Sequence, residues 1–151
     1  MKQIVVGETV NQSLCDWVAS KAGGSWLPGE GHAIGLAEDG KLIACVVYDH
    51  WNGKSLYAHI AAEPGAFWTT KAYLKRIFSY PFLFVGCHKL IGLVGGEGKA
   101  INSLVSDFGF VCEATLHDAH PAGALTIWSM TRDQCRWIDW RPRGKRLSTA
   151  T

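Results

Sequence analysis

Hydrophobic positions along the chain follow two periods, one of two residues and one of between three and four. Short β-branched or alternating runs are typical of strands, and apolar residues at helical spacing are typical of helices that bury one face. The strand pattern occurs at 2–6, 33–37, 42–48, 56–62, 89–94, 111–116 and 125–130. The helix pattern occurs at 10–22, 67–78 and 100–108. The predicted order is therefore β-α-β-β-β-α-β-α-β-β.

The turns between the strands predict how the strands pair. Asp39-Gly40 and Asn52-Gly53 are typical of tight hairpins, so the second, third and fourth strands should form an antiparallel meander. A helix separates the strand at 56–62 from the strand at 89–94, and a right-handed crossover makes such a pair parallel. We therefore predict one α/β domain with a mixed, mostly antiparallel, twisted sheet and helices on both faces.

The composition fits a globular protein. Of 151 residues, 48% are hydrophobic and 19% are charged, a balance that supports a packed core and argues against a disordered chain. The longest apolar run is interrupted too early to span a bilayer, and no signal-peptide pattern opens the chain. We therefore expect a cytoplasmic protein without membrane contact.

The net charge of +2 is unevenly distributed along the chain. Residues 132–146 hold six basic and two acidic side chains, a charge of +4, so the rest of the chain carries −2. We expect a folded domain at 1–138 and a basic C-terminal tail at 139–151. Such a tail either keeps the protein soluble or binds nucleic acid through its arginines, and we favour the first. The arginines in question are Arg136, Arg141, Arg143 and Arg146.

Cysteine and histidine spacing gives no sign of a metal site. The five cysteines are widely spaced and form no C-x-x-C pair, so most are expected to be small buried residues. His117 and His120 lie close together in a Pro/Gly turn without a third ligand. A solvated turn is favoured there, and no metal is expected.

The junction between the strand at 56–62 and the following helix has features of an anion site. A helix N-terminus offers free N–H groups and a positive dipole end. Here a turn at 64–66 leads into Thr69, Thr70 and Lys71, and a second Gly-rich helix start at 95–99 should lie on the same edge. Two such ends suit an extended, phosphate-bearing ligand. An ordinary strand-to-helix connection is the alternative.

The order of elements and three segments resemble the GNAT superfamily of N-acetyltransferases over nearly the whole chain. The segments are the hairpin at 40–44, the strand His59-Ile60-Ala61-Ala62-Glu63, and the late segment from Asp107 to Glu113 with its Gly109-Phe110 pair. The pattern is most similar to small members that phages and prophages encode.

The resemblance implies acetyl-CoA as cosubstrate. In that family the strand matching Ile60, Ala61 and Ala62 pairs with the pantetheine arm, and a backbone N–H near Ile60–Ala61 would polarise the thioester carbonyl. The loop and helix start that would take the pyrophosphate match Phe67, Trp68, Thr69, Thr70 and Lys71.

Two departures from the family pattern stand out. The small residues of the usual phosphate loop are replaced by Phe67 and Trp68. The family's helix Asn and its Tyr acid would fall on Gly98 and Val105. Asn102 and Ser106 are the nearby substitutes, and Asn102 is the one expected to contact the cofactor.

A general base must take a proton from the attacking amine, and Glu63 and His59 are the candidates. Strand alternation places their side chains on one face of the sheet. The alternative is that His59 is only hydrogen-bonded in the sheet and Glu63 lies on the surface. Tyr48, Asp49 and Trp51 end the neighbouring strand and are expected to line the acceptor pocket.

Two functions follow from these features. The first is transfer of an acetyl group from acetyl-CoA to a primary amine of a small molecule or protein, by direct attack. The second is a non-catalytic phage protein of the same fold that binds a host protein or nucleic acid. The edge of the final hairpin also leads us to expect a homodimer.

Overall fold

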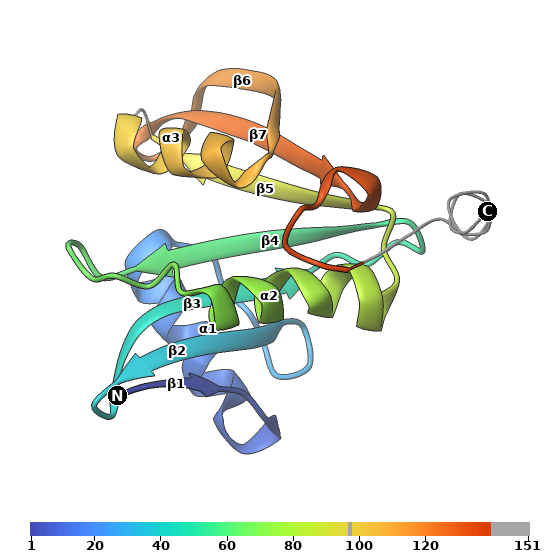
Figure 1. Cartoon of the computed structure of the whole chain (residues 1–151). Helices are drawn as coiled ribbons and strands as arrows, with labels where there is room; N and C mark the ends of the chain where they lie inside the picture. The colour runs from blue at the N-terminus through green and yellow to red at the C-terminus, as the bar shows by residue number, and fades with distance from the viewer. Residues whose placement is uncertain (97, 140–151) are drawn as a thin grey trace, which may run out of the picture.

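The structure, a computed structural model, describes residues 1–96 and 98–139 (Figure 1). The strands are β1 (Lys2–Val5), β2 (His32–Glu38), β3 (Lys41–Asp49), β4 (Ser55–Ala62), β5 (Lys89–Gly95), β6 (Val111–His120) and β7 (Gly123–Thr131). The helices are α1 (Glu8–Ala22), α2 (Lys71–Ser79) and α3 (Lys99–Phe108), with a π-helix at Tyr80–Val85 and a 3₁₀ turn at Arg132–Gln134. The predicted order and the predicted α/β class are confirmed.

The seven strands form one mixed sheet in the order β1-β2-β3-β4-β5-β7-β6. Within the described residues, β4 and β5 run parallel and the other neighbouring pairs are antiparallel. α1 covers one face of the sheet, where Leu14, Cys15 and Val18 pack on Ala33, Cys45, Val47 and Ala61. α2 covers the other face (Figure 1) and its apolar side belongs to the larger core cluster.

α2 is shorter than predicted at its start. Its apolar stripe, at residues 73, 74, 77 and 78, is buried, as the helical spacing requires. Thr70 is extended, and its hydroxyl accepts a hydrogen bond from the Tyr73 N–H at 3.3 Å, so the helix begins at Lys71 and not at Phe67. The α-helix ends at Ser79, directly before the Tyr80-Pro81 pair that is expected to stop it, but a π-helix that was not predicted follows and continues to Val85.

A glycine ends the π-helix. Gly86 adopts the left-handed conformation, with φ of 83°, and the N–H groups of Gly86 and Cys87 both donate to the Pro81 carbonyl. Proline fits the first turn because no N–H is needed there.

The sheet is split between its two parallel strands. β4 and β5 pair over only four residues each, from Ser55 opposite Lys89 to Ala58 opposite Gly92. Beyond that point β4 stays paired with β3 as far as Ala62, and β5 stays paired with β7 as far as Gly95. The C-terminal halves of β4 and β5 therefore diverge, which Figure 1 shows as a V that opens toward the arrowheads of both strands.

The segment after the last strand packs back on the domain. Trp137 stacks on Phe78 of α2, and its indole N–H donates to the Phe108 carbonyl at 2.8 Å. Arg136 donates to the same carbonyl at 3.2 Å. The expected basic tail at 139–151 lies outside the described residues except for Asp139, and so do the arginines after residue 139.

Four of the five cysteines are buried, as expected; Cys112 is exposed, and all five are free thiols. None of the helices in the described ranges is long and apolar enough to cross a membrane.

Candidate functional site

The split between β4 and β5 connects two hollows on opposite faces of the sheet. The hollow on the α2 face is apolar, has a volume of about 60 Å³ and is lined by the strands, by Phe78 of α2 and by Phe108 of α3. The hollow on the α1 face has a volume of about 480 Å³ and is lined by His59, by the end of α1 and by the β6–β7 turn. Ile60, Leu93 and Val94 line both hollows. The two hollows therefore adjoin each other at the split, and we call the split together with both hollows the cleft.

The backbone of β4 presents unpaired groups to this cleft. The Glu63 N–H donates to the Ile43 carbonyl at 2.8 Å, which identifies Glu63 and Ile43 as a hydrogen-bonded pair of the antiparallel ladder. Because such pairs alternate, Ala61 also bonds to β3, whereas Ile60 and Ala62 turn their N–H and C=O groups toward β5. The pairing with β5 has ended by that point.

The same reasoning applies to β5. The Gly96 N–H donates to the Ala124 carbonyl at 2.7 Å, so the backbone groups of Gly95 and Leu93 face β4. Two strand edges with free donors and acceptors thus line the cleft. Such edges bind an extended chain that carries amides.

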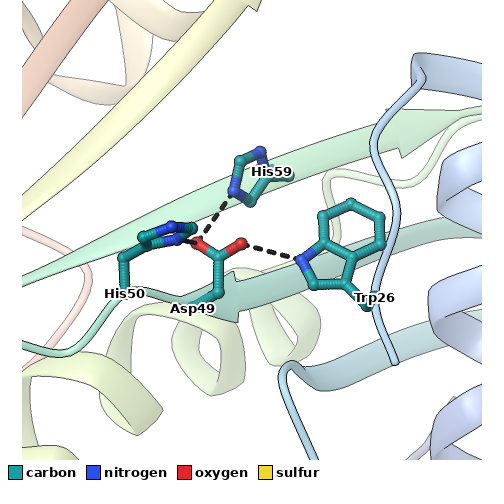
Figure 2. A network of polar contacts seen from close by, with 4 residues as sticks. All are labelled: Trp26, Asp49, His50 and His59. Atoms are coloured by element: carbon teal, nitrogen blue, oxygen red, sulfur yellow. Dashed lines mark hydrogen bonds and ion pairs between the residues drawn. The ribbon is translucent and has the colours of Figure 1, made fainter. Parts of the chain in front are cut away.

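Asp49 organises the polar side chains on the α1 face of the cleft (Figure 2). Its Oδ1 lies 2.9 Å from His59 Nε2 and 3.0 Å from His50 Nδ1. Its Oδ2 accepts the Trp26 indole N–H at 2.7 Å. Trp26 comes from the loop after α1, and its ring meets the His59 imidazole edge-on, with the centroids 5.2 Å apart. These contacts fix the orientation of His59.

The Asp49 carboxylate is ionised at neutral pH. Burial raises the pKa of Asp49, but hydrogen bonds from His59, Trp26 and His50 outweigh burial and bring the pKa down to about 2. A carboxylate can only accept, so His59 donates from Nε2. In the neutral imidazole, Nδ1 is then the nitrogen that can accept a proton.

Comparison with solved structures assigns the fold. Mutant forms of the spermidine/spermine N-acetyltransferase SpeG from Vibrio cholerae match with a TM-score of 0.69 at 16% identity, over 88% of this chain and 96% of that one. The ribosomal-protein-S18-alanine N-acetyltransferase from Escherichia coli matches with a TM-score of 0.66 at 16% identity, over 87% and 94%. A dodecameric spermidine N-acetyltransferase from Vibrio cholerae has a TM-score of 0.66 at 13% identity, over 87% and 94%. No protein-family model matches the sequence, and no curated protein matches it.

The chain has the fold of the GNAT N-acetyltransferases. The expected likeness to phage-encoded members stays a prediction.

On this GNAT-like fold, Glu63 lies on the same face as His59, as strand alternation predicts. Its carboxylate pairs with the Lys21 ammonium of α1 at 2.7 Å, and both side chains are about 30% exposed. The hydrogen bond from Lys21 lowers the pKa of Glu63. Glu63 therefore stands at the rim of the cleft, whereas His59 stands inside it.

At the helix start that is expected to hold phosphate, most side chains already contact other residues of the protein. Trp68 is buried between the rings of Tyr73 and Phe108, with centroids 6.2 and 5.8 Å away. Thr70 caps the Tyr73 N–H. Phe67 is 64% exposed, and the Lys2 ammonium lies 5.1 Å above its ring. In the first turn of α2, Lys71 and Ala72 are exposed, and Thr69 before it is half-buried.

The three residues expected in the acceptor pocket lie in different places. Asp49 holds His59, as described. Tyr48 is buried on the α2 face, where its hydroxyl donates to the Ile77 carbonyl, and burial raises its pKa well above the usual value. Trp51 is 47% exposed in the turn between β3 and β4, and it lines neither hollow.

Asn102 has both of its amide atoms engaged. It donates to the Gly98 carbonyl at 2.8 Å and accepts the Trp128 indole N–H at 3.0 Å. Val105, at the family's Tyr position, lines the apolar hollow on the α2 face.

Sequence reasoning missed Trp26 as a partner of Asp49, and it missed the wall that His120 and Lys21 form on the α1-face hollow. One signal did point there, since the long Gly-rich loop at 23–31 is typical of a segment that lies over a site. Among residues 1–96 and 98–139, no three His, Cys, Asp or Glu side chains lie close enough to hold a metal ion.

Proposed function

We propose that this protein transfers an acetyl group from acetyl-CoA to a primary amine by direct attack. The observation that carries the proposal is the split between β4 and β5, which joins hollows on the two faces of the sheet at Ile60, Leu93 and Val94. A donor and an acceptor can meet in such a cleft from opposite sides.

The donor's pantetheine arm fits the cleft because it is extended and carries two amides. The outward-facing backbone groups of Ile60 and Ala62 on β4, and of Leu93 and Gly95 on β5, supply donors and acceptors for it. The apolar hollow on the α2 face receives its methylene groups. Ala61 separates Ile60 from Ala62 and turns its side chain toward α1.

The charged end of the donor would lie at the start of α2. N–H groups at the first two positions of the helix, the Lys71 ammonium and the Thr69 hydroxyl can contact phosphate there. Thr70, Trp68 and Phe67 shape this loop, and the buried Trp68 leaves the backbone less room than small residues would. We therefore expect weaker acetyl-CoA binding than a small-residue loop would give.

His59 is the proposed general base, and it acts on an amine that enters from the α1 face. Its Nδ1 takes the amine proton while the nitrogen forms a bond to the acetyl carbon. The Ile60 N–H donates to the carbonyl oxygen as negative charge grows there. The carbon–sulfur bond then breaks, the CoA thiolate leaves and takes a proton from water, and the His59 imidazolium gives its proton to the hydroxide that remains. Asp49 stabilises the imidazolium that forms.

Release of the CoA thiol in the presence of amines tests this function, and mass spectrometry identifies the product. We expect His59→Gln to lower kcat roughly 100-fold or more, the range that general-base catalysis supplies. Glu63→Gln should change kcat much less, because Glu63 is paired with Lys21 at the rim. An equal loss of kcat in the two variants would mean that Glu63 takes part in the reaction.

The non-catalytic alternative has a distinct outcome in the same assay. It predicts that acetyl-CoA binding, if present, is followed by no thiol release with any amine. The expected homodimer, which would use the exposed edge strand β6, and the cytoplasmic location stay predictions.

A further inference from the structure

The hollow on the α1 face continues outward as a groove toward the β6–β7 turn. A second hollow, of about 560 Å³, shares with the first the residues 21–24 at the end of α1 and also His120 and Ala122. We call the two together the acceptor groove. His59 stands at its inner end and Pro121 at its outer end.

The α1 wall of this groove attracts positive charge. α1 is 15 residues long, and it ends at Ala22, where the Gly23 N–H closes on the Ala19 carbonyl at 3.0 Å. The last carbonyls of a helix have no partners within the helix and form its negative dipole end. A substrate ammonium is therefore favoured beside residues 22–24, next to His59.

The opposite wall presents a hydrogen-bond donor. His120 Nδ1 accepts the Ala122 N–H at 3.0 Å, so the neutral imidazole carries its proton on Nε2. The imidazole ring packs against Gly95, since a Cβ at position 95 would be 2.3 Å from Nε2 and 2.4 Å from Cδ2 and Cε1. His120 thus donates from Nε2 at the edge of the cleft and has no acceptor capacity left. The Lys21 ammonium adds a second donor at the rim, paired there with Glu63.

We infer that the acceptor is an α-amino group, that is, a primary amine one carbon away from a carbonyl or carboxylate. The inference rests on the proposed function and names the substrate class of the same site. The amine meets the α1 carbonyls and His59, and the carbonyl oxygen accepts the Nε2–H of His120. A protonated polyamine offers only donors, so it has no oxygen that could accept the Nε2–H of His120.

Free amino acids and peptide N-termini share this chemistry. The groove continues past His120 to Pro121 and is open there, which leaves room for residues beyond the first. A tripeptide amide and free L-alanine therefore form two arms of the test.

The experiment compares kcat/KM of the wild-type chain for an alanyl tripeptide amide, L-alanine, n-butylamine and spermidine, with thiol release as the readout. We expect the tripeptide amide or L-alanine to exceed spermidine at least tenfold. The better of the two identifies the source of the α-amino group. Preference for spermidine would overturn this inference and leave the proposed function standing, whereas no transfer to any amine would overturn both.

A variant pair separates recognition from folding. His120→Ala should raise KM for the α-amino substrate about tenfold, as loss of one hydrogen bond predicts, with little change in kcat. The same variant should lower kcat/KM for n-butylamine much less, because n-butylamine has no carbonyl for the Nε2–H to bind. His117→Ala, an exposed position on the same strand, is the matched control and should change neither. Equal losses for both amines in His120→Ala would contradict the assigned role.

Discussion

Asp49 Oδ1 and His59 Nε2 lie 2.9 Å apart across two adjacent strands, and this bond decides which nitrogen of His59 faces the cleft. Asp49→Asn removes the charge that stabilises the imidazolium. We expect kcat to fall roughly 10–100-fold, because part of what the general base contributes is lost with that charge, and KM for acetyl-CoA should not change.

His50→Ala is the matched control for that variant. His50 bonds the same oxygen at 3.0 Å, but its side chain is 72% exposed and lines neither hollow. Its removal should leave kcat within about twofold of the wild type, the scatter of an ordinary surface change. A similar loss in both variants would mean that the network is only structural.

The same carboxylate predicts a stability difference in acid. The pKa of Asp49 is about 2 in the folded chain, below the value near 3.9 of an unfolded aspartate. The contribution of Asp49 to the free energy of unfolding is therefore fully present above about pH 5 and is lost as the pH falls toward 2. Between pH 5 and pH 2, the wild type should lose roughly 1–2 kcal/mol more unfolding free energy than Asp49→Asn. Urea unfolding at a series of pH values measures this, and parallel curves would rule the contribution out.

Substitutions at two glycines of β5 should affect different substrates, one the binding of acetyl-CoA and the other the binding of the amine. A Cβ at Gly92 would meet only Phe110 and Trp128, at 3.8 and 4.0 Å, and Gly92 lines the apolar hollow on the α2 face. Gly92→Ala should keep the fold and weaken acetyl-CoA binding by roughly three- to tenfold, because a methyl group enters the donor's space. Titration calorimetry gives the Kd.

Gly95→Ala is the counterpart of that variant. Its Cβ would collide with the His120 ring, which is the movable end of a side chain and will shift. We expect a higher KM for the amine with a nearly unchanged Kd for acetyl-CoA. If both glycine variants changed the binding of the same substrate, the assignment of acetyl-CoA to the α2 face and of the amine to the α1 face would be wrong.

Trp137 should mark the C-terminal limit of the folded domain. Its ring packs against Phe78 and Phe108, and its N–H bonds the Phe108 carbonyl. Trp137→Ala should lower the free energy of unfolding by about 2–3 kcal/mol, whereas the exposed Trp51→Ala should lower it by less than about 0.5 kcal/mol. Removal of residues 139–151 should leave the thermal midpoint unchanged. A large loss on that truncation would move the domain boundary.

The element order could be predicted because each element carries its own period. The start of α2 could not, because Phe67 and Trp68 extend the apolar pattern backward while the Thr70 cap fixes the true start. The π-helix was missed for a related reason, since a Tyr80-Pro81 pair ordinarily ends a helix. The turns that follow are defined by hydrogen bonds from the Gly86 and Cys87 N–H groups to the Pro81 carbonyl, which the sequence does not reveal.

The candidate site was predictable only in part. Alternation along β4 placed His59 and Glu63 on one face, and the family resemblance directed attention to the β4 backbone. The contact of Trp26 with Asp49 spans 23 residues, and that of Asp49 with His59 depends on the register of β3 and β4. Neither the loop conformation nor the register can be read from local periodicity, and the same holds for the position of His120 over Gly95.

Titration calorimetry of acetyl-CoA into the full-length protein tests most directly whether the split between β4 and β5 is a donor site. We predict one acetyl-CoA bound per chain, with binding weakened by Gly92→Ala and unaffected by His117→Ala. No heat of binding at millimolar acetyl-CoA would contradict the account.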